Sequence, residues 1–232
     1  PGYFYEYAAS TEERRNLAVV RKGEYEALEA KLVDPQWQPD FGPAEFDKAK
    51  HTGATAISAR DFLIAYNVNL NTTSTRRANA VAYDIREKGR IKRVGEVLSG
   101  DIVKDADGTT LWTPGKLKHV KAIGWYIEEY GVTQVTMNIT NITETPLHLA
   151  FDETAKAANA RGIRATGSEL VGLVPKSAIL EAGKYFLRKQ NRSTGIHESE
   201  LIKIAIKSMG LDLSLIHISE PTRRYAISYA VF

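Results

Sequence analysis

The chain has 232 residues, of which 43% are hydrophobic and 25% charged, which is the composition of an ordinary globular protein. Cysteine is absent, so disulfides, thiolate catalysis and cysteine-based metal sites are excluded. The net charge is only +3 and no dense basic run accompanies it, so the composition does not favour nucleic-acid binding. No apolar run approaches the ~20 residues that a membrane helix needs, and no secretory signal pattern opens the sequence. Because it begins with Pro1 rather than Met, we expect the true N-terminus to lie upstream.

The first sixty residues predict one strand followed by short helices. Residues 2–7 are rich in aromatic side chains and suit a strand. Ser10, with Glu13 three residues later, is typical of a capped helix start. Short helices are expected at residues 17–22 and 24–32, and three prolines predict a loop over residues 34–44.

From residue 62 onward, strand-type and helix-type patterns alternate along the chain. The expected elements are a strand at 62–70, a helix at 73–88, a polar hairpin or excursion at 89–114, strands at 118–128 and 132–142, a helix at 146–161, a strand within 163–174, and helices at 177–190 and 198–209. The order strand, helix, strand, strand, helix, strand predicts an α/β (α+β) chain with a ferredoxin-like βαββαβ subdomain. Such a subdomain has an antiparallel sheet with two helices on one face.

The last twenty residues, 213–232, differ from the rest of the chain. Residues 213–223 and 227–232 resemble the translation of a sequencing adapter on either side of a variable index. We therefore interpret this tail as non-native read-through and exclude it from fold reasoning. The alternative is a genuine C-terminal strand over residues 227–232, which the apolar pattern alone permits.

The remaining residues carry few recognisable catalytic motifs. Outside the tail lie four histidines, His51, His119, His148 and His197, and no two have metal-ligand spacing on one helix. No metal site, nucleophile elbow, dinucleotide fingerprint or P-loop is predicted. The loop at residues 39–46 and the small residues at 52–56 stand out, because a glycine followed by small residues allows a ligand to approach the backbone closely. The alternative interpretation is an ordinary surface turn held in place by its flanking aromatic residues.

Seven blocks, in order along the chain, resemble the glutamate formimidoyltransferase family. They are RKGEYE (residues 21–26), PDFGP (39–43), GAT (53–55), ARDFLIAYNVNL (59–70), AIGWY (122–126), TPLH (145–148) and GSELVGLVP (167–175). The resemblance covers nearly all of residues 1–212, and the ordered set is far more specific than any single block.

The resemblance implies a cytoplasmic one-carbon transferase. It would move the formimino group from N-formimino-L-glutamate to tetrahydrofolate in histidine degradation, with small-molecule substrates, no metal, no nucleic acid or membrane partner, and a homodimer as a candidate assembly. The family's transferase unit has two α/β subdomains with folate between them. We expect residues 1–60 to be the end of the N-terminal subdomain, most of which is missing, with the second subdomain at 61–190 and a helical extension at 191–212. The family's catalytic histidine would lie upstream of Pro1, so this chain alone is expected to be inactive.

The resemblance also assigns a folate-binding segment. It matches residues 42–53, although the stretch 47–51 varies within the family and is left out. Arg60 is added because its guanidinium, at the mouth of the following strand, can bind a folate or glutamate carboxylate in a bidentate manner. An ordinary surface or interdomain ion pair is the alternative for Arg60. The predicted folate-binding residues are Gly42, Pro43, Ala44, Glu45, Phe46, Gly53, Ala54 and Arg60.

Two other classes compete with this interpretation. A ferredoxin-like module could bind RNA or a regulatory ligand, but residues 122–126 lack the aromatic strand motif of RNA-recognition sheets. A related cyclodeaminase partner domain is expected to be all-helical, unlike this strand-rich chain.

Overall fold

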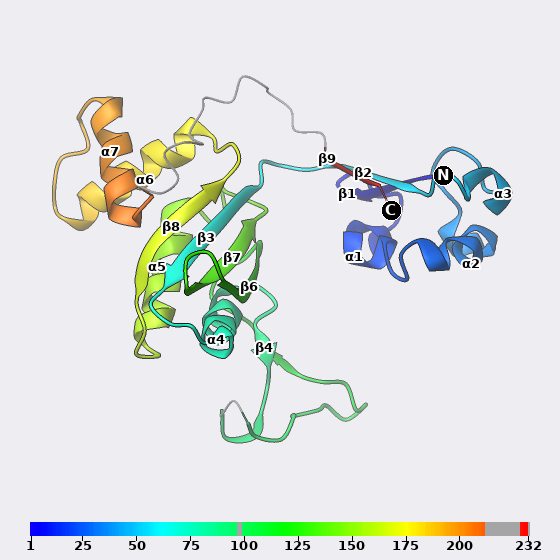
Figure 1. The fold of residues 1–232 in the computed structure, drawn as a ribbon, viewed down its shortest axis with the longest axis horizontal. Coiled ribbons are helices and arrows are strands. Elements are labelled where there is room, and N and C mark those ends of the chain that lie inside the picture. Colours follow the sequence, from blue (N-terminus) through cyan, green and yellow to red (C-terminus); the bar gives the residue numbers. More distant parts are fainter. Residues whose placement is uncertain (97–98, 212–227, 232) are drawn as a thin grey trace. The chain divides into compact units, whose positions relative to one another are not determined.

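The computed structural model describes residues 1–96, 99–211 and 228–231, and the chain divides into two compact units (Figure 1). The first comprises Pro1–Asp61 with the strand Ser228–Val231, and the second begins at Phe62. Both contain strands and helices, which confirms the predicted mixed α/β class. Within the described ranges, none of the helices combines the length and apolar character needed to cross a bilayer.

The first unit is built on a three-stranded sheet in the order β1-β2-β9. Strands β1 (Gly2–Glu6) and β2 (Thr55–Ala59) are parallel, with Gly2 opposite Thr55, and β9 (Ser228–Val231) is antiparallel to β2. Between β1 and β2 lie η1 (Glu12–Arg15), α1 (Leu17–Val20), η2 (Tyr25–Ala27), α2 (Leu28–Val33), η3 (Pro35–Trp37) and α3 (Phe46–Ala49). Alternate side chains of β1, Tyr3 and Tyr5, pack with Leu28 and Leu32 in a small core.

Three expectations for the first unit were wrong or incomplete. Ser10 does not cap a helix: η1 begins after Thr11, and the Ser10 hydroxyl instead accepts a hydrogen bond from Arg14 at 3.3 Å. Strand β2 and helix α3 were not expected. Strand β2 has five residues, of which three are alanine or serine, so its β signal is weak, and its partner β1 lies about fifty residues away.

The C-terminal tail falls mostly outside the described residues. This is true of residues 212–227 and 232, and so of most of the segment interpreted as read-through. The described part, Ser228–Val231, is a strand paired with β2, as the alternative interpretation expected. The read-through origin itself stays a prediction, because only the underlying codons can test it.

The second unit contains a four-stranded sheet in the order β6-β7-β3-β8, in which every neighbouring pair is antiparallel. The strands are β3 (Ile64–Leu70), β6 (Val120–Ile127), β7 (Val132–Ile139) and β8 (Ala165–Val171). Helices α4 (Thr75–Ile85) and α5 (Leu147–Asn159) pack on one face of this sheet. Each of these six elements was predicted, and each observed range falls inside the predicted one.

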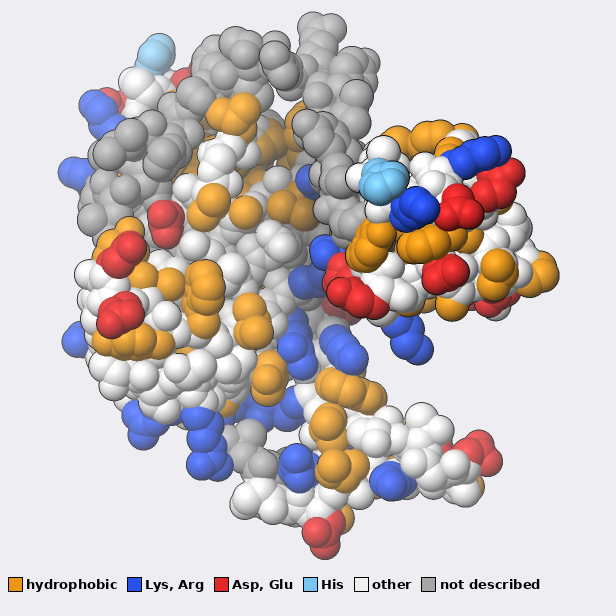
Figure 2. Space-filling view, turned by 45° about the vertical axis from the view of Figure 1, so that its right-hand side comes forward, with side chains coloured by type: hydrophobic (Ala, Val, Ile, Leu, Met, Phe, Trp, Pro, Cys, Tyr) orange, Lys and Arg blue, Asp and Glu red, His pale blue; other side chains and the backbone are white. Residues whose placement is uncertain are grey.

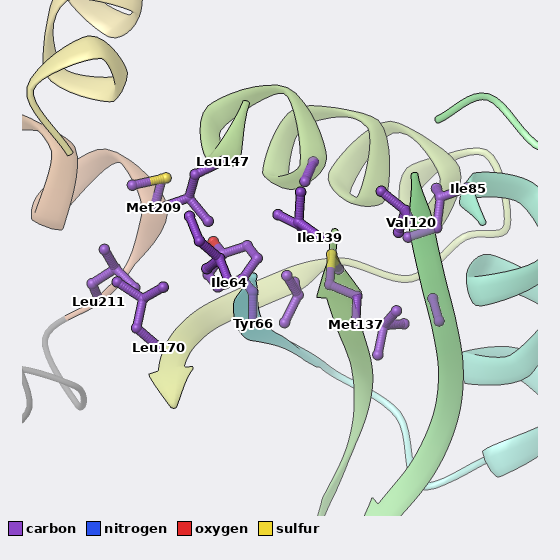
Figure 3. Close-up of a cluster of buried hydrophobic side chains, with 14 of the residues drawn as sticks. Ile64, Tyr66, Ile85, Val120, Met137, Ile139, Leu147, Leu170, Met209 and Leu211 are labelled. Carbon is purple, nitrogen blue, oxygen red and sulfur yellow. The ribbon is translucent and has the colours of Figure 1, made fainter. Parts of the chain in front are cut away.

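The core of the second unit lies between the sheet and its helices. Strand β3 sends Ile64, Tyr66, Val68 and Leu70 into this core, where every one of them is buried. Figure 3 shows Ile64, Tyr66, Met137 and Ile139 from the sheet grouped with Leu147 of α5, and Met209 and Leu211 beside them. The intervening residues of β3 include Asn67 and Asn69, which therefore belong to the opposite face of the sheet.

Two further helices complete the unit. Helices α6 (Lys176–Lys189) and α7 (Glu198–Met209) pack closely at Gly183. A β-carbon built on this glycine would lie only 2.2 Å from the Leu201 carbonyl oxygen. Residues from α7 lie in the same core as the sheet, so this helix is packed into the unit. The predicted excursion at 89–114 is confirmed as a short antiparallel pair, β4 (Arg90–Ile91) and β5 (Trp112–Thr113), with η4 (Val94–Glu96) between them.

Helix α4 is hydrogen-bonded to the edge strand β6 and packs closely against it. The Asn79 amide donates to the Gly124 carbonyl at 2.9 Å and accepts from the Gly124 N–H at 3.1 Å. The two elements approach so closely that a β-carbon on Gly124 would lie 2.3 Å from the Ala78 carbonyl carbon. A glycine is therefore required in the AIGWY block for packing reasons.

The molecular surface carries scattered apolar side chains. On the face drawn in Figure 2, hydrophobic side chains reach the surface among charged ones. Over the described surface as a whole, Tyr7, Val33, Ile123 and Trp125 are each at least half exposed. Isolated exposed apolar residues are normal in globular proteins, so exposure alone does not identify a site.

Candidate functional site

The predicted folate-binding segment begins and ends at glycines with a left-handed backbone. Gly42 has φ of +82° and Gly53 has φ of +64°, a region that other residues adopt only under strain. Phe41, just before the segment, accepts a hydrogen bond from the Gly2 N–H at 2.8 Å, and the Thr55 N–H after it bonds to the Pro1 carbonyl at 3.0 Å. The segment is thus a connection anchored at both ends to the start of β1.

The residues of this segment differ in exposure. Gly42, Ala44 and Glu45 are exposed, Pro43, Phe46 and Gly53 are half-buried, and Ala54 is fully buried. Because the Ala54 side chain packs in the core of the first unit, only its backbone could meet a ligand. Glu45 is paired with Lys48 at 3.1 Å, and the hydrogen bond from Lys48 lowers the pKa of this exposed carboxyl.

A buried ion pair between Arg14 and Asp40 holds the chain that leads into this segment. The Arg14 guanidinium contacts Asp40 at 3.0 Å and donates to the carbonyls of Gln36 and Gln38 at 2.9 and 2.7 Å. Asp40 also accepts from the Phe4 N–H at 2.7 Å. Sequence reasoning included Asp40 in the PDFGP block but missed Arg14, because the pairing spans 26 residues and Arg14 lies in an apparently exposed helical pattern.

Arg60 lies at the other end of strand β2 from Gly53. Six residues lie between them, five of which form β2, so the strand holds them about 20 Å apart. The Arg60 side chain is half-buried and, among the described residues, has no hydrogen-bond or ion-pair partner. The structure thus leaves the guanidinium available for an anion, but it does not place Arg60 beside the segment from Gly42 to Gly53.

His148 is packed in a side-chain cluster between α5 and α6. Its ring stacks on Tyr185 with centroids 4.3 Å apart, and burial lowers its pKa. The Tyr185 hydroxyl donates to Asp152 at 2.5 Å, which raises the pKa of Tyr185 to about 12, and Lys189 contacts the same carboxylate at 2.6 Å. His148, the histidine of the TPLH block, therefore has a packing role between α5 and α6.

The described part of the chain contains no group of three or more His, Asp or Glu side chains arranged to hold a metal ion. A cavity with a volume of about 440 Å³ lies between α4, α5 and the β4–β5 hairpin. Its walls include Asp84 and Arg90, which are in contact, and Arg161 contacts the same carboxylate at 2.5 Å. None of the predicted folate-binding residues lines it.

Comparison with known proteins gives matches along both units. A family model described as "Formiminotransferase domain, N-terminal subdomain" matches residues 1–60, so that subdomain is represented in the chain. A second model, "Formiminotransferase domain", matches residues 65–231.

Individual relatives agree with these models. The chain is 42% identical over 212 residues to a formimidoyltransferase-cyclodeaminase of Gallus gallus, covering 91% of this chain and 35% of that protein. It is 34% identical to a glutamate formimidoyltransferase of Thermoplasma acidophilum, covering 88% and 59% of the two chains. A glutamate formimidoyltransferase of Streptococcus pyogenes is 32% identical, with coverages of 82% and 55%. The chain thus spans about a third of the cyclodeaminase relative and less than two thirds of the shorter ones. It belongs to the formiminotransferase family.

Proposed function

We propose that this chain is the folate-binding part of a glutamate formimidoyltransferase, which moves a formimino group from N-formimino-L-glutamate to tetrahydrofolate. The observation that carries the proposal is the match of two successive formiminotransferase models to residues 1–60 and 65–231. The names of the relatives support the same reaction. The proposed subdomains follow these ranges, with the second one ferredoxin-like, in keeping with its strand order β6-β7-β3-β8.

We further propose that folate contacts the segment from Gly42 to Ala54 through its backbone and its exposed edges. Glycines with positive φ at both ends allow a flat ligand to approach main-chain groups without a side chain in the way. Arg60 would bind a carboxylate of folate or glutamate, because its guanidinium has no partner among the described residues.

The catalytic base is proposed to lie outside the 232 residues. In the family resemblance, none of the histidines of this chain matches the catalytic one, and His148 is occupied in its stack with Tyr185. Loss of a positioned general base costs about 10²–10⁴-fold in rate. The 232-residue chain assayed alone should therefore show no turnover above a buffer control. Turnover by this chain would refute that proposal, and His148 would then be the first residue to replace.

The folate-binding role of Arg60 is tested by Arg60→Ala in a form of the protein that turns over substrate. Loss of a charge-assisted contact with a carboxylate is worth about 1.5–3 kcal/mol, which is roughly 10- to 150-fold in tetrahydrofolate affinity. Arg15→Ala is the matched control, since Arg15 is an exposed arginine of the same unit that pairs with Glu12 at 3.0 Å on the surface. An unchanged folate affinity combined with a large loss of stability would show that Arg60 is structural.

A further inference from the structure

The face of the four-stranded sheet opposite α4 and α5 carries a compact polar cluster. Strand register places Thr136, Asn67 and Glu169 side by side in one row across β7, β3 and β8. The neighbouring row places Gln134 beside Asn69. Asn67, Asn69 and Gln134 are all more than 90% buried, whereas Thr136 and Glu169 are half-buried. A row of amides at the centre of a sheet is unusual, because strands favour β-branched and aromatic residues.

The amide side chains of this cluster are oriented by hydrogen bonds toward one carboxylate. Gln134 donates to the Asn69 side-chain oxygen at 2.7 Å, which fixes the Gln134 amide. Asn67 donates to Glu169 Oε2 at 3.3 Å, and Gln134 approaches the same oxygen at 3.5 Å. Both contacts with Glu169 are long and both involve Oε2. Within the part of the chain that the structure describes, Oε1 has no partner and no cation pairs with Glu169.

Thr136 adds a second unsatisfied group to the row of this carboxylate, with Asn67 between them. Its hydroxyl oxygen is buried and has no hydrogen-bond partner among the described residues. Buried polar atoms without a partner are rare in folded proteins, because each one loses its hydrogen bonds to water. An unpartnered hydroxyl in the same row as a half-buried carboxylate without a counter-cation is the pattern of a site that a ligand completes.

The donors and acceptors of the cluster define the ligand chemistry. A carboxylate with Oε1 free and no cation near it among the described residues favours a positively charged ligand that presents two adjacent N–H groups in one plane, one for Oε1 and one for the Thr136 hydroxyl oxygen of the same row. A protonated amidine has this arrangement, and the formimino group of N-formimino-L-glutamate is an amidine. A formyl group of the same size would instead point a carbonyl oxygen toward the carboxylate, which disfavours it.

We propose that Glu169, oriented by Asn67 and Gln134 and assisted by the Thr136 hydroxyl, binds the amidinium group of the formimino donor. The identity of the donor rests on the proposed function, whereas the amidinium preference rests on the cluster alone. The pterin ring of tetrahydrofolate also carries two adjacent N–H groups, but it is neutral and gains less from an unpaired carboxylate.

The test compares two matched ligands on the full 232-residue chain by titration calorimetry. N-formimino-L-glutamate should bind about 10- to 100-fold more tightly than N-formyl-L-glutamate, which differs only in carrying oxygen in place of the amidinium nitrogen. Glu169→Gln should abolish this preference while leaving binding of the formyl compound unchanged. Glu129→Gln is the control: Glu129 is an exposed carboxylate in the turn between β6 and β7, and its substitution should keep the preference.

Two further measurements keep the proposal falsifiable if substitutions perturb the fold. Thr136→Val removes a hydroxyl that makes no hydrogen bond in the described structure, so it should not lower stability but should weaken amidinium binding. Formamidinium chloride, used as a probe, should shift the side-chain amide NMR signals of Asn67 and Gln134 in the wild type and not in Glu169→Gln.

The outcomes separate this inference from the proposed function. Formamidinium binding that depends on Glu169, without binding of N-formimino-L-glutamate, would support the amidinium site and count against the formimidoyltransferase assignment. Binding of N-formimino-L-glutamate with a preference unaffected by Glu169→Gln would overturn the site and leave that assignment standing. A loss of tetrahydrofolate affinity alone in Glu169→Gln would also overturn it, since the cluster would then hold the pterin.

Discussion

The contact between Gly124 and helix α4 predicts a large effect for Gly124→Ala. The new β-carbon would lie 2.3 Å from the Ala78 carbonyl carbon and 2.4 Å from the Asn79 nitrogen, where ordinary contacts begin at 3.4 Å. Both are backbone atoms, so the helix must move away from the strand by about 1 Å. That movement also stretches the two hydrogen bonds between Asn79 and Gly124.

The expected cost combines two effects. Overpacking of a tight contact costs about 1–3 kcal/mol, and loss of the two hydrogen bonds adds about 1 kcal/mol each. The free energy of unfolding of the second unit should therefore fall by about 3–5 kcal/mol. At about 2–4 °C per kcal/mol for a chain of this size, Tm should fall by roughly 6–20 °C.

Urea denaturation followed by the fluorescence of Trp125, which lies on the same strand, measures this loss directly. Gly195→Ala is the matched control, because its nearest neighbour would be the Ser193 hydroxyl at 3.6 Å and its φ is not positive. It should change the unfolding free energy by less than about 0.5 kcal/mol. A loss below about 1 kcal/mol in Gly124→Ala would refute the reasoning, because it would mean that β6 and α4 separate at little cost.

Other substitutions test the remaining contacts. Arg14→Met should destabilise the first unit by about 3–5 kcal/mol in chemical denaturation, because it leaves Asp40 buried without its cation. Asp40→Asn should cost less, because the asparagine still offers an acceptor to the Phe4 N–H. Equal, small losses in the two variants would contradict the role of the ion pair. Gly183→Ala should lower Tm, since its β-carbon would lie 2.2 Å from the Leu201 carbonyl oxygen, and an unchanged melting curve would show that α6 and α7 are free to separate. Burial lowers the pKa of His148 in the folded state, so its contribution to stability is complete above the unfolded pKa of about 6.5 and is lost as pH falls below that value. Thermal scans from pH 8 to 5 should show this decline, and His148→Gln should flatten it.

The elements of the second unit were predictable because their signals are local. Strand β3 alternates apolar and polar residues, and α4 has Ala78, Val81, Ala82 and Ile85 on one face, so each periodicity is visible within ten residues. Two other local signals marked where elements begin and end: a proline lies at the start of α5, and a turn separates β6 from β7.

The candidate sites were harder to predict, because their residues meet only through distant pairings. Asn67 and Glu169 are 102 residues apart in the chain, and only the register of β3 with β8 brings them into one row. Arg14 and Asp40 likewise are 26 residues apart and meet across a series of short helices that has no repeating pattern. Strand β2 is only five residues long and three of them are alanine or serine, which gives a weak strand signal, so the strand between the predicted folate segment and Arg60 was missed.

The position of β3 in the sheet has a consequence for how the chain folds during synthesis. Both of its neighbours, β7 and β8, follow it in the sequence, by about 70 and 100 residues. Until β7 has emerged from the ribosome, β3 presents an apolar face and two unpaired hydrogen-bonding edges. Contacts of such long sequence separation make folding slow. The nascent second unit should therefore depend on protection of this single strand, and its aggregation during expression should be set by residues 64–70 more than by any other segment.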